Sequence, residues 1–230
     1  MTTTAQNAQL TQAPQSTGSL VMIGTLGGIA LVSGLLLALV YHGTYDTIQR
    51  NNYERTAEAV LTLLPGAVSQ KMFAVHAPGP NGDATPQNIY AGYDADGNLM
   101  GVALEALDNG GYGGEIRLLY GYLPDKEIVT GMRVLLSKET PGLGDRIKTD
   151  PGFQKNFNGL DVSLDPDTRK PKNPISYTKP GTDKEPWQVE GISGATISSQ
   201  AVARAMRNSV NTLLPIVHEM LDELRKGGKS

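Results

Sequence analysis

The stretch NIYAGYDADGNLMGVALEAL, residues 88–107, decides the fold. Two mostly apolar runs, 88–93 and 99–107, flank the polar segment DADGN. Asp-Gly and Asn accept the positive φ angles of tight turns, so this pattern predicts a β-hairpin. Further strands are predicted at 116–122 and 128–136, separated by LPDKE, which extends the hairpin into a short antiparallel meander.

A long amphipathic helix is predicted at the carboxyl end of the chain. Its apolar residues recur at helical spacing and are Ile197, Ala201, Ala205, Val210, Leu213, Val217, Met220 and Leu224. Pro215 lies inside this run and is expected to kink the helix. Residues 77–87 are predicted to be a loop, and 161–186, with five prolines, an irregular excursion. The order of elements favours an α+β domain, a small antiparallel sheet covered by helices.

The amino-terminal part of the chain is strongly apolar. Residues 20–41 (LVMIGTLGGIALVSGLLLALVY) contain no charged residue. A helix of this length spans about 30 Å of hydrocarbon, so a single transmembrane helix is predicted. A cleaved signal peptide is the alternative. The long apolar run, the absence of a basic flank before it and the lack of a small-x-small cleavage pattern after it favour a retained anchor.

The residues after the apolar run are predicted to link the anchor to the domain. Apolar residues return at intervals over 45–64 until Pro65 and Gly66 stop the helix. The predicted organisation is an amino-terminal tail over 1–18, a transmembrane helix over 19–43, a helical stalk over 44–66 and one globular domain over 67–230. Arg50 and Arg55 follow the apolar run, and the positive-inside rule alone would place the domain in the cytoplasm.

Composition excludes several kinds of chemistry. The chain has no cysteine, which removes disulfides, thiolate nucleophiles and cysteine-bound iron–sulfur clusters. His42, His76 and His218 show no metal-ligand spacing, so no metal site is predicted. The net charge of -3 comes without a basic stripe, so no nucleic-acid partner is expected. No catalytic residue is predicted, and any redox centre must be an organic cofactor.

The sequence GISGATISS, residues 191–199, lies immediately before the long helix. A helix start offers unpaired backbone N–H groups and the positive end of the macrodipole, which together favour an anionic phosphate. Gly194 and Ala195 leave the approach unobstructed, and Thr196 supplies a hydroxyl. On composition alone, a serine-rich helix cap after a glycine turn is the simpler explanation.

Two further segments contain closely spaced glycines: SKETPGLGD, residues 137–145, and GGYGG, residues 110–114. In the first, the proline and glycines would let the backbone approach a flat ring, the leucine would contact its apolar face, and the glutamate and threonine would hydrogen-bond its polar edge. The alternative is an ordinary strand-ending turn. For GGYGG the alternative is a β-bulge.

These segments carry a family resemblance. The string SGAT followed by ISS resembles the flavinylation motif of the FMN-binding subunits of Rnf ion-translocating complexes and of the related sodium-pumping NADH:quinone reductases. The other two segments are similar to the ETPGLG signature and the glycine-rich loop of that family, in the family's order. In that family a flavin transferase joins FMN to the last threonine of the motif as a phosphoester. The resemblance therefore implies a covalent FMN on Thr196.

The resemblance also implies which other residues bind FMN. They are Ser193, Gly194, Ala195, Glu139, Thr140, Gly142, Leu143, Gly144 and Gly113. The family usually has an aspartate six residues before the acceptor threonine, whereas this chain has Glu190. The carboxylate is kept on a side chain one methylene longer, which puts the efficiency of the modification in question.

The resemblance to the G subunit of Rnf complexes implies an electron-transfer role in an NADH:ferredoxin oxidoreductase, with no independent catalytic activity. It implies a single-pass protein of the bacterial inner membrane whose domain lies on the periplasmic face, against the arginine pattern. The implied partners are the FMN-carrying membrane protein of the complex (its D subunit), the membrane A and E subunits, the iron–sulfur B and C subunits, the flavin transferase and the lipid bilayer. The alternatives are the FMN subunit of a sodium-pumping NADH:quinone reductase, usually a longer chain, and a membrane-anchored extracytoplasmic binding or sensor domain without covalent flavin.

Overall fold

The computed structural model describes residues 18–78 and 84–228, and the chain divides into two units, Met1–Asn52 and Tyr53–Ser230. The helices are α1 (Ser19–Leu63), the short 3-10 helix η1 (Gly144–Lys148), α2 (Pro151–Lys155), α3 (Thr196–Glu219) and α4 (Leu221–Gly227). The strands are β1 (Ser69–Pro78), β2 (Ala84–Tyr93), β3 (Leu99–Gly111), β4 (Gly114–Leu123), β5 (Ile128–Ser137), β6 (Leu160–Asp161), β7 (Ser176–Thr178) and β8 (Gln188–Glu190). The α+β prediction is confirmed.

Strands β1 to β6 form one sheet in sequence order, and all neighbours in it are antiparallel. The predicted hairpin is β2–β3. The Asp94 carboxylate closes its turn by accepting hydrogen bonds from the backbone N–H groups of Asp96 at 2.9 Å and Asn98 at 2.8 Å. The other predicted strands are β4 and β5, so the meander is confirmed.

The prediction of a loop over 77–87 is wrong at both of its ends. β1 continues to Pro78 and β2 begins at Ala84, while 79–83 lie outside the described residues. β1 was not predicted from the sequence because it is an edge strand. Side chains in its first half are mostly exposed or half-buried, so the alternation that marks a buried strand is absent.

The excursion over 161–186 is largely irregular, as predicted. It contains the end of β6, an isolated bridge between Leu164 and Pro171, and β7, which pairs in parallel with β8. A kink was predicted at Pro215, but the carboxyl-terminal helix is not interrupted at that residue. α3 runs through that proline to Glu219, and α4 begins two residues later at Leu221.

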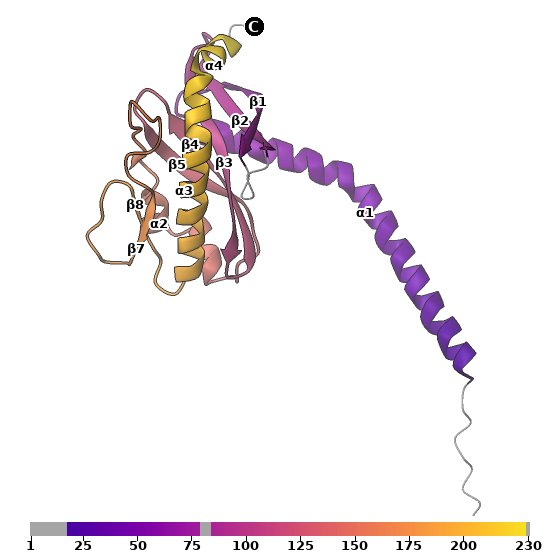
Figure 1. Cartoon of the computed structure of the whole chain (residues 1–230). Helices are drawn as coiled ribbons and strands as arrows, with labels where there is room; N and C mark the ends of the chain where they lie inside the picture. The colour runs from indigo at the N-terminus through magenta and orange to yellow at the C-terminus, as the bar shows by residue number, and fades with distance from the viewer. Residues whose placement is uncertain (1–17, 79–83, 229–230) are drawn as a thin grey trace, which may run out of the picture. The chain divides into compact units, whose positions relative to one another are not determined.

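α3 lies across one face of the sheet (Figure 1) and buries its apolar side there. Alternate residues of the strands point to this face because successive side chains of a strand point to opposite sides. The buried strand residues include Ile89, Leu104, Ile116, Leu118 and Tyr120, and the buried α3 residues include Ala201, Val202, Ala205, Met206 and Val210. Each fully buried aliphatic side chain stabilises the domain by about 1.5–3 kcal/mol.

Polar side chains fix the position of α3 along the sheet. Tyr120 donates a hydrogen bond to the Ser209 hydroxyl at 3.0 Å, and that hydroxyl donates to the carbonyl of Glu105 at 2.7 Å. One turn and more toward the amino-terminal end, Arg204 binds the Asp108 carboxylate through two nitrogens, at 2.9 and 3.1 Å. Because these bonds join different turns of α3 to β3 and β4, the helix has one axial register.

The carboxyl-terminal end of α1 packs on the opposite face of the sheet. Its buried residues Ala59, Val60, Leu63 and Leu64 form a second core with Tyr90, Ala103 and Leu119. Here the sheet surface consists of one glycine from each of four strands: Gly92, Gly101, Gly121 and Gly131. A Cβ atom on Gly121 would lie 2.6 Å from the Leu63 carbonyl oxygen. Thr130 donates a hydrogen bond to that same oxygen. The glycines let the helix end rest directly on the backbone of the sheet.

An earlier part of α1 is strongly apolar. Val21–Ile48 has a mean hydropathy of 2.3 over its most apolar window, and no residue of that window is buried. It is the one helix among the described residues that is long and apolar enough to cross a membrane. The rings of Tyr41 and Tyr45 contact one another near its carboxyl-terminal end, tilted by 51° with centroids 5.8 Å apart.

The glycine surface under α1 yields a stability prediction. Gly121→Ala places a methyl group against the Leu63 carbonyl and should lower the free energy of unfolding by about 2 kcal/mol, because overpacking displaces the helix end. In thermal unfolding followed by circular dichroism, the melting temperature of the full chain in detergent should fall by about 4–8 °C. Gly152→Ala is the control, since outside its own helix its new methyl meets no backbone atom within 4 Å and only one oxygen of the Asp150 carboxylate, at 3.3 Å. Equal melting temperatures for both variants would contradict the proposed packing.

Candidate functional site

A pocket of about 280 Å³ lies where three distant segments of the chain meet. One segment is the tip of the β3–β4 hairpin, the second is the loop after β5, and the third is the turn into α3. The lining residues are Tyr112, Glu139, Thr140, Leu143, Gly144, Gly194, Ala195, Thr196, Ile197 and Ser198. The three glycine-containing segments of the sequence therefore build one site.

The turn into α3 leaves backbone donors free. Gly194 has a φ of +85°, a conformation that other residues rarely adopt, and Ala195 precedes the first helical residue. The first bond of the helix runs from the Ser199 N–H to the Ala195 carbonyl at 2.9 Å. The backbone N–H groups of 196–198 have no acceptor among the described residues. These donors and the positive end of the helix dipole make the turn suitable for an anion.

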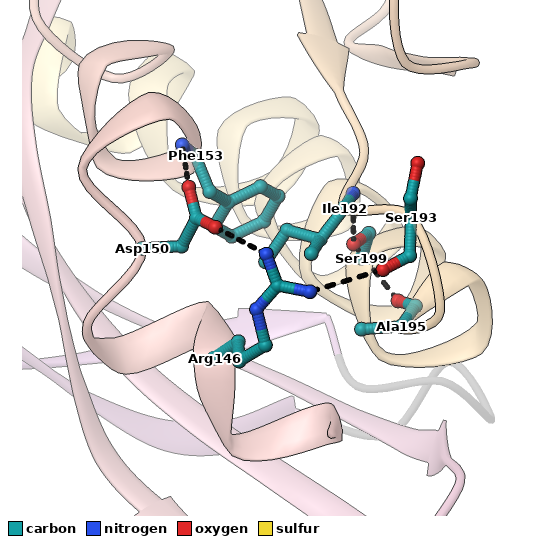
Figure 2. A network of polar contacts seen from close by, with 7 residues as sticks. All are labelled: Arg146, Asp150, Phe153, Ile192, Ser193, Ala195 and Ser199. Carbon is teal, nitrogen blue, oxygen red and sulfur yellow. Dashed lines mark hydrogen bonds and ion pairs between the residues drawn. The ribbon is translucent and has the colours of Figure 1, made fainter. Parts of the chain in front are cut away.

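A network of polar contacts holds this turn in place (Figure 2). The Ser199 hydroxyl donates to the Ala195 carbonyl at 2.9 Å and accepts from the Ile192 N–H at 3.1 Å. On the other side Arg146, from η1, donates to the Ser193 carbonyl at 3.1 Å. The turn is therefore fastened both from within α3 and from a separate element.

Asp150 holds the Arg146 side chain. Its carboxylate accepts from the Arg146 guanidinium at 2.7 Å and from the Phe153 N–H at 3.1 Å (Figure 2). The Phe153 N–H and the hydrogen bond from Arg146 lower the pKa of Asp150 below its ordinary value. The carboxylate is thus kept ionised, and Arg146 keeps its direction toward Ser193.

Glu139 joins the other two segments. One carboxylate oxygen accepts from the Gly113 N–H at 3.2 Å, and the other accepts from the Ser198 hydroxyl at 2.9 Å. A Cβ atom on Gly113 would collide with the carbonyl of Lys138, so only glycine lets the hairpin tip lie against this loop. The carboxylate fixes the hairpin tip and the first turn of α3 to one another.

The structure brings together most of the residues predicted from the sequence, but not all. Those that line the pocket are Glu139, Thr140, Leu143, Gly144, Gly194, Ala195 and Thr196. Gly113, Gly142 and Ser193 do not line it. Gly113 meets Glu139 through its N–H, Gly142 takes a positive φ of 77° in the turn before Leu143, and Ser193 accepts the hydrogen bond from Arg146.

Sequence reasoning missed several residues of the site. Tyr112, Ile197 and Ser198 line the pocket, and Arg146 braces it. Tyr112 is 73% exposed, Leu143 55% and Ile197 48%, an unusual exposure for large apolar side chains. The sequence signal that could have marked Tyr112 as a site residue is its position as a large aromatic residue between turn glycines. Nothing in the sequence alone marks Arg146, because its role depends on a tertiary contact.

Glu190, the residue that departs from the family pattern, is directed elsewhere. Its carboxylate accepts from the Gly181 N–H at 2.7 Å and so fastens the end of the proline-rich excursion. It does not line the pocket.

Among the described residues no group of three or more His, Cys, Asp or Glu side chains could hold a metal ion. The pocket thus combines free N–H donors, a hydroxyl and an exposed apolar rim, which suits a flat ring carrying a phosphate.

Comparisons with known proteins agree on the family. Residues 111–211 match the model of the FMN-binding domain family. The chain is 37% identical to the G subunit of the ion-translocating oxidoreductase complex of Methanosarcina acetivorans, over 83% of this chain and 92% of that protein. It is 31% identical to the protein of the same name from Vibrio cholerae, over 80% of this chain and 85% of that protein.

Solved structures share the fold. NqrC of Shewanella oneidensis superposes with a TM-score of 0.60 at 19% identity, covering 77% of this chain and all of that one (100%). The C subunit of the Na(+)-translocating NADH-quinone reductase of Parabacteroides distasonis gives a TM-score of 0.54 at 20% identity, covering 78% of this chain and 96% of that one. With the sequence relatives above, these findings show that the chain belongs to the family of G subunits of ion-translocating oxidoreductase complexes.

Proposed function

We propose that this chain is the FMN-carrying electron-transfer subunit of an Rnf-type ion-translocating oxidoreductase complex, with FMN joined by a phosphoester to Thr196. The observation that carries the proposal is the turn into α3. There the Thr196 hydroxyl and the free N–H groups of 196–198 open into one pocket, inside the segment that matches the FMN-binding domain family. The names of the sequence relatives support the assignment to the complex.

The residues present fit FMN. The free N–H groups of 196–198 would bind the phosphate oxygens, since a helix start attracts anions. Tyr112, Leu143 and Ile197 would cover apolar parts of the ring, and the Thr140 side chain would face its polar edge. Bound FMN supplies a relay between two-electron and one-electron carriers. The protein holds the ring in place, and the phosphoester keeps it from dissociating.

The roles of Ser193, Gly142 and Gly113 are indirect in this proposal. Ser193 gives its carbonyl to Arg146 and so keeps the acceptor turn in shape. Gly142 allows the turn that presents Leu143, and Gly113 lets the hairpin tip lie against the loop of Glu139. These residues would support the binding site without contacting the cofactor.

We place the chain in the bacterial inner membrane as a single-pass protein, with the domain on the periplasmic face. The apolar segment Val21–Ile48 supports the span, and Tyr41 and Tyr45 suit a membrane interface, where tyrosines are enriched. The side of the membrane rests on the family resemblance alone. The partners would be the FMN-carrying membrane D subunit, the membrane A and E subunits, the iron–sulfur B and C subunits, and a flavin transferase for attachment.

The competing functions make different predictions for the cofactor. The FMN protein of a sodium-pumping NADH:quinone reductase would carry the same flavin but purify with other partners. A sensor or binding domain without covalent flavin would show no flavin after denaturation. The fold shared with the two quinone reductase proteins does not separate these possibilities, because their identity to this chain is only 19% and 20%.

The acceptor is tested by substitution at Thr196. Protein produced together with its flavin transferase should show the mass of attached FMN and a fluorescent band on a denaturing gel. Thr196→Ala should lose both signals because no hydroxyl remains to form the phosphoester. Thr196→Ser, which keeps a hydroxyl, should regain part of the attachment. Unchanged flavin fluorescence in the denatured Thr196→Ala protein would disprove this acceptor.

The brace on the acceptor turn is tested at Arg146. Arg146→Ala should lower the initial rate of FMN attachment about threefold to tenfold, since one charge-assisted hydrogen bond of about 1 kcal/mol is lost. The melting temperature should hardly change. Arg117→Ala is the matched control, because Arg117 is also a half-exposed arginine, 46% against 43%, with one carboxylate partner. The same attachment rate in both variants would rule out this role.

A further inference from the structure

Glu139 is a buried carboxylate without a cationic partner. Its residue is 6% exposed, and no lysine, arginine or histidine forms an ion pair with it among the described residues. Arg146, the arginine that braces the site, is already engaged by Asp150 and the Ser193 carbonyl. Burying a charge in this way is costly, so an unpaired buried carboxylate in a pocket wall indicates a functional constraint.

The Glu139 carboxylate accepts hydrogen bonds from two groups of the site. Both oxygens act as acceptors, one from the Gly113 N–H at 3.2 Å and one from the Ser198 hydroxyl at 2.9 Å. Ser198 lies in the first turn of α3, where the positive end of the helix dipole stabilises a negative charge. The protein thus supports the charge with dipoles instead of a counter-ion.

Glu139 is also the one charged side chain among the described residues that line the pocket. The pocket holds about 280 Å³, so a ring seated there would share this small space with the carboxylate. Water and salt screen a buried charge less than an exposed one, so the field of the carboxylate would act on the ring.

We propose that Glu139 holds the reduction potential of the bound flavin low by placing a fixed negative charge beside the ring. This inference rests on the function proposed above. In a titration, two electrons from dithionite, which is oxidised, and one proton from water add one negative charge to the ring. The carboxylate repels that added charge and so opposes reduction. Removing the carboxylate charge therefore shifts the equilibrium toward the reduced form.

The test compares midpoint potentials of the full chain, loaded with FMN by its transferase and titrated in detergent with redox mediators. Glu139→Gln keeps the shape and removes the charge. Its equilibrium constant for reduction should rise at least tenfold, which is about 30 mV for a two-electron couple. Glu139→Asp, which keeps the charge, should stay closer to the wild-type value. Asp145→Asn is the control, because it removes a carboxylate of the adjoining helix η1 that does not line the pocket and should change the constant less than twofold.

Intact-mass analysis of each protein before the titration separates the possible failures. A wild-type chain that carries no FMN would overturn the proposed function and this inference with it. A loaded Glu139→Gln protein with the wild-type midpoint would overturn this inference alone. If Glu139→Gln does not fold, Ser198→Ala replaces it. That variant removes one donor that disperses the charge and should lower the midpoint, and an unchanged midpoint would again overturn the inference.

Discussion

The packing of α3 against the sheet determines where the turn into α3 lies. The helix buries one side on the sheet, and hydrogen bonds from Tyr120 and Arg204 prevent it from sliding. Its amino-terminal end therefore lies at the same end of the strands as the β3–β4 hairpin tip and the loop after β5. The anion-binding part of the pocket follows from this one placement, because the free N–H groups and the Thr196 hydroxyl belong to the helix end itself.

This helix end combines groups with opposite effects on a nearby anion. The free N–H groups of 196–198 attract an anion, while the Glu139 carboxylate repels one. The protein assigns these effects to different groups of the first turn: the backbone N–H groups of 196–198 have no acceptor among the described residues, and the Ser198 hydroxyl binds Glu139. In the proposed function, the backbone would hold the phosphate and the carboxylate would act on the ring.

The sequence was sufficient for the elements with strong local signals. The Asp-Gly turn and the alternating apolar residues predict β2 and β3, and helical spacing predicts α3, because these patterns depend on near neighbours. β1 was missed because no side chain in the first half of this edge strand is buried. Buried and exposed positions therefore do not alternate there. The family motifs placed Thr196 and most of the lining residues, but Arg146 could not be found, since its contact with Ser193 joins η1 to a turn 47 residues away. Nor could sequence show that Glu190 turns away from the pocket.

The axial register of α3 limits how this domain can change in length during evolution. One residue inserted between Thr196 and Ser209 would rotate the start of the helix by about 100° and shift it by about 1.5 Å. Either Thr196 would then leave the pocket, or Ser209 would lose its hydrogen bonds with Tyr120 and Glu105. The stretches 166–170 and 179–186 of the irregular segment carry no such restriction, because their side chains are exposed. Length variation among relatives should therefore accumulate there, while the interval between the threonine and the serine stays constant.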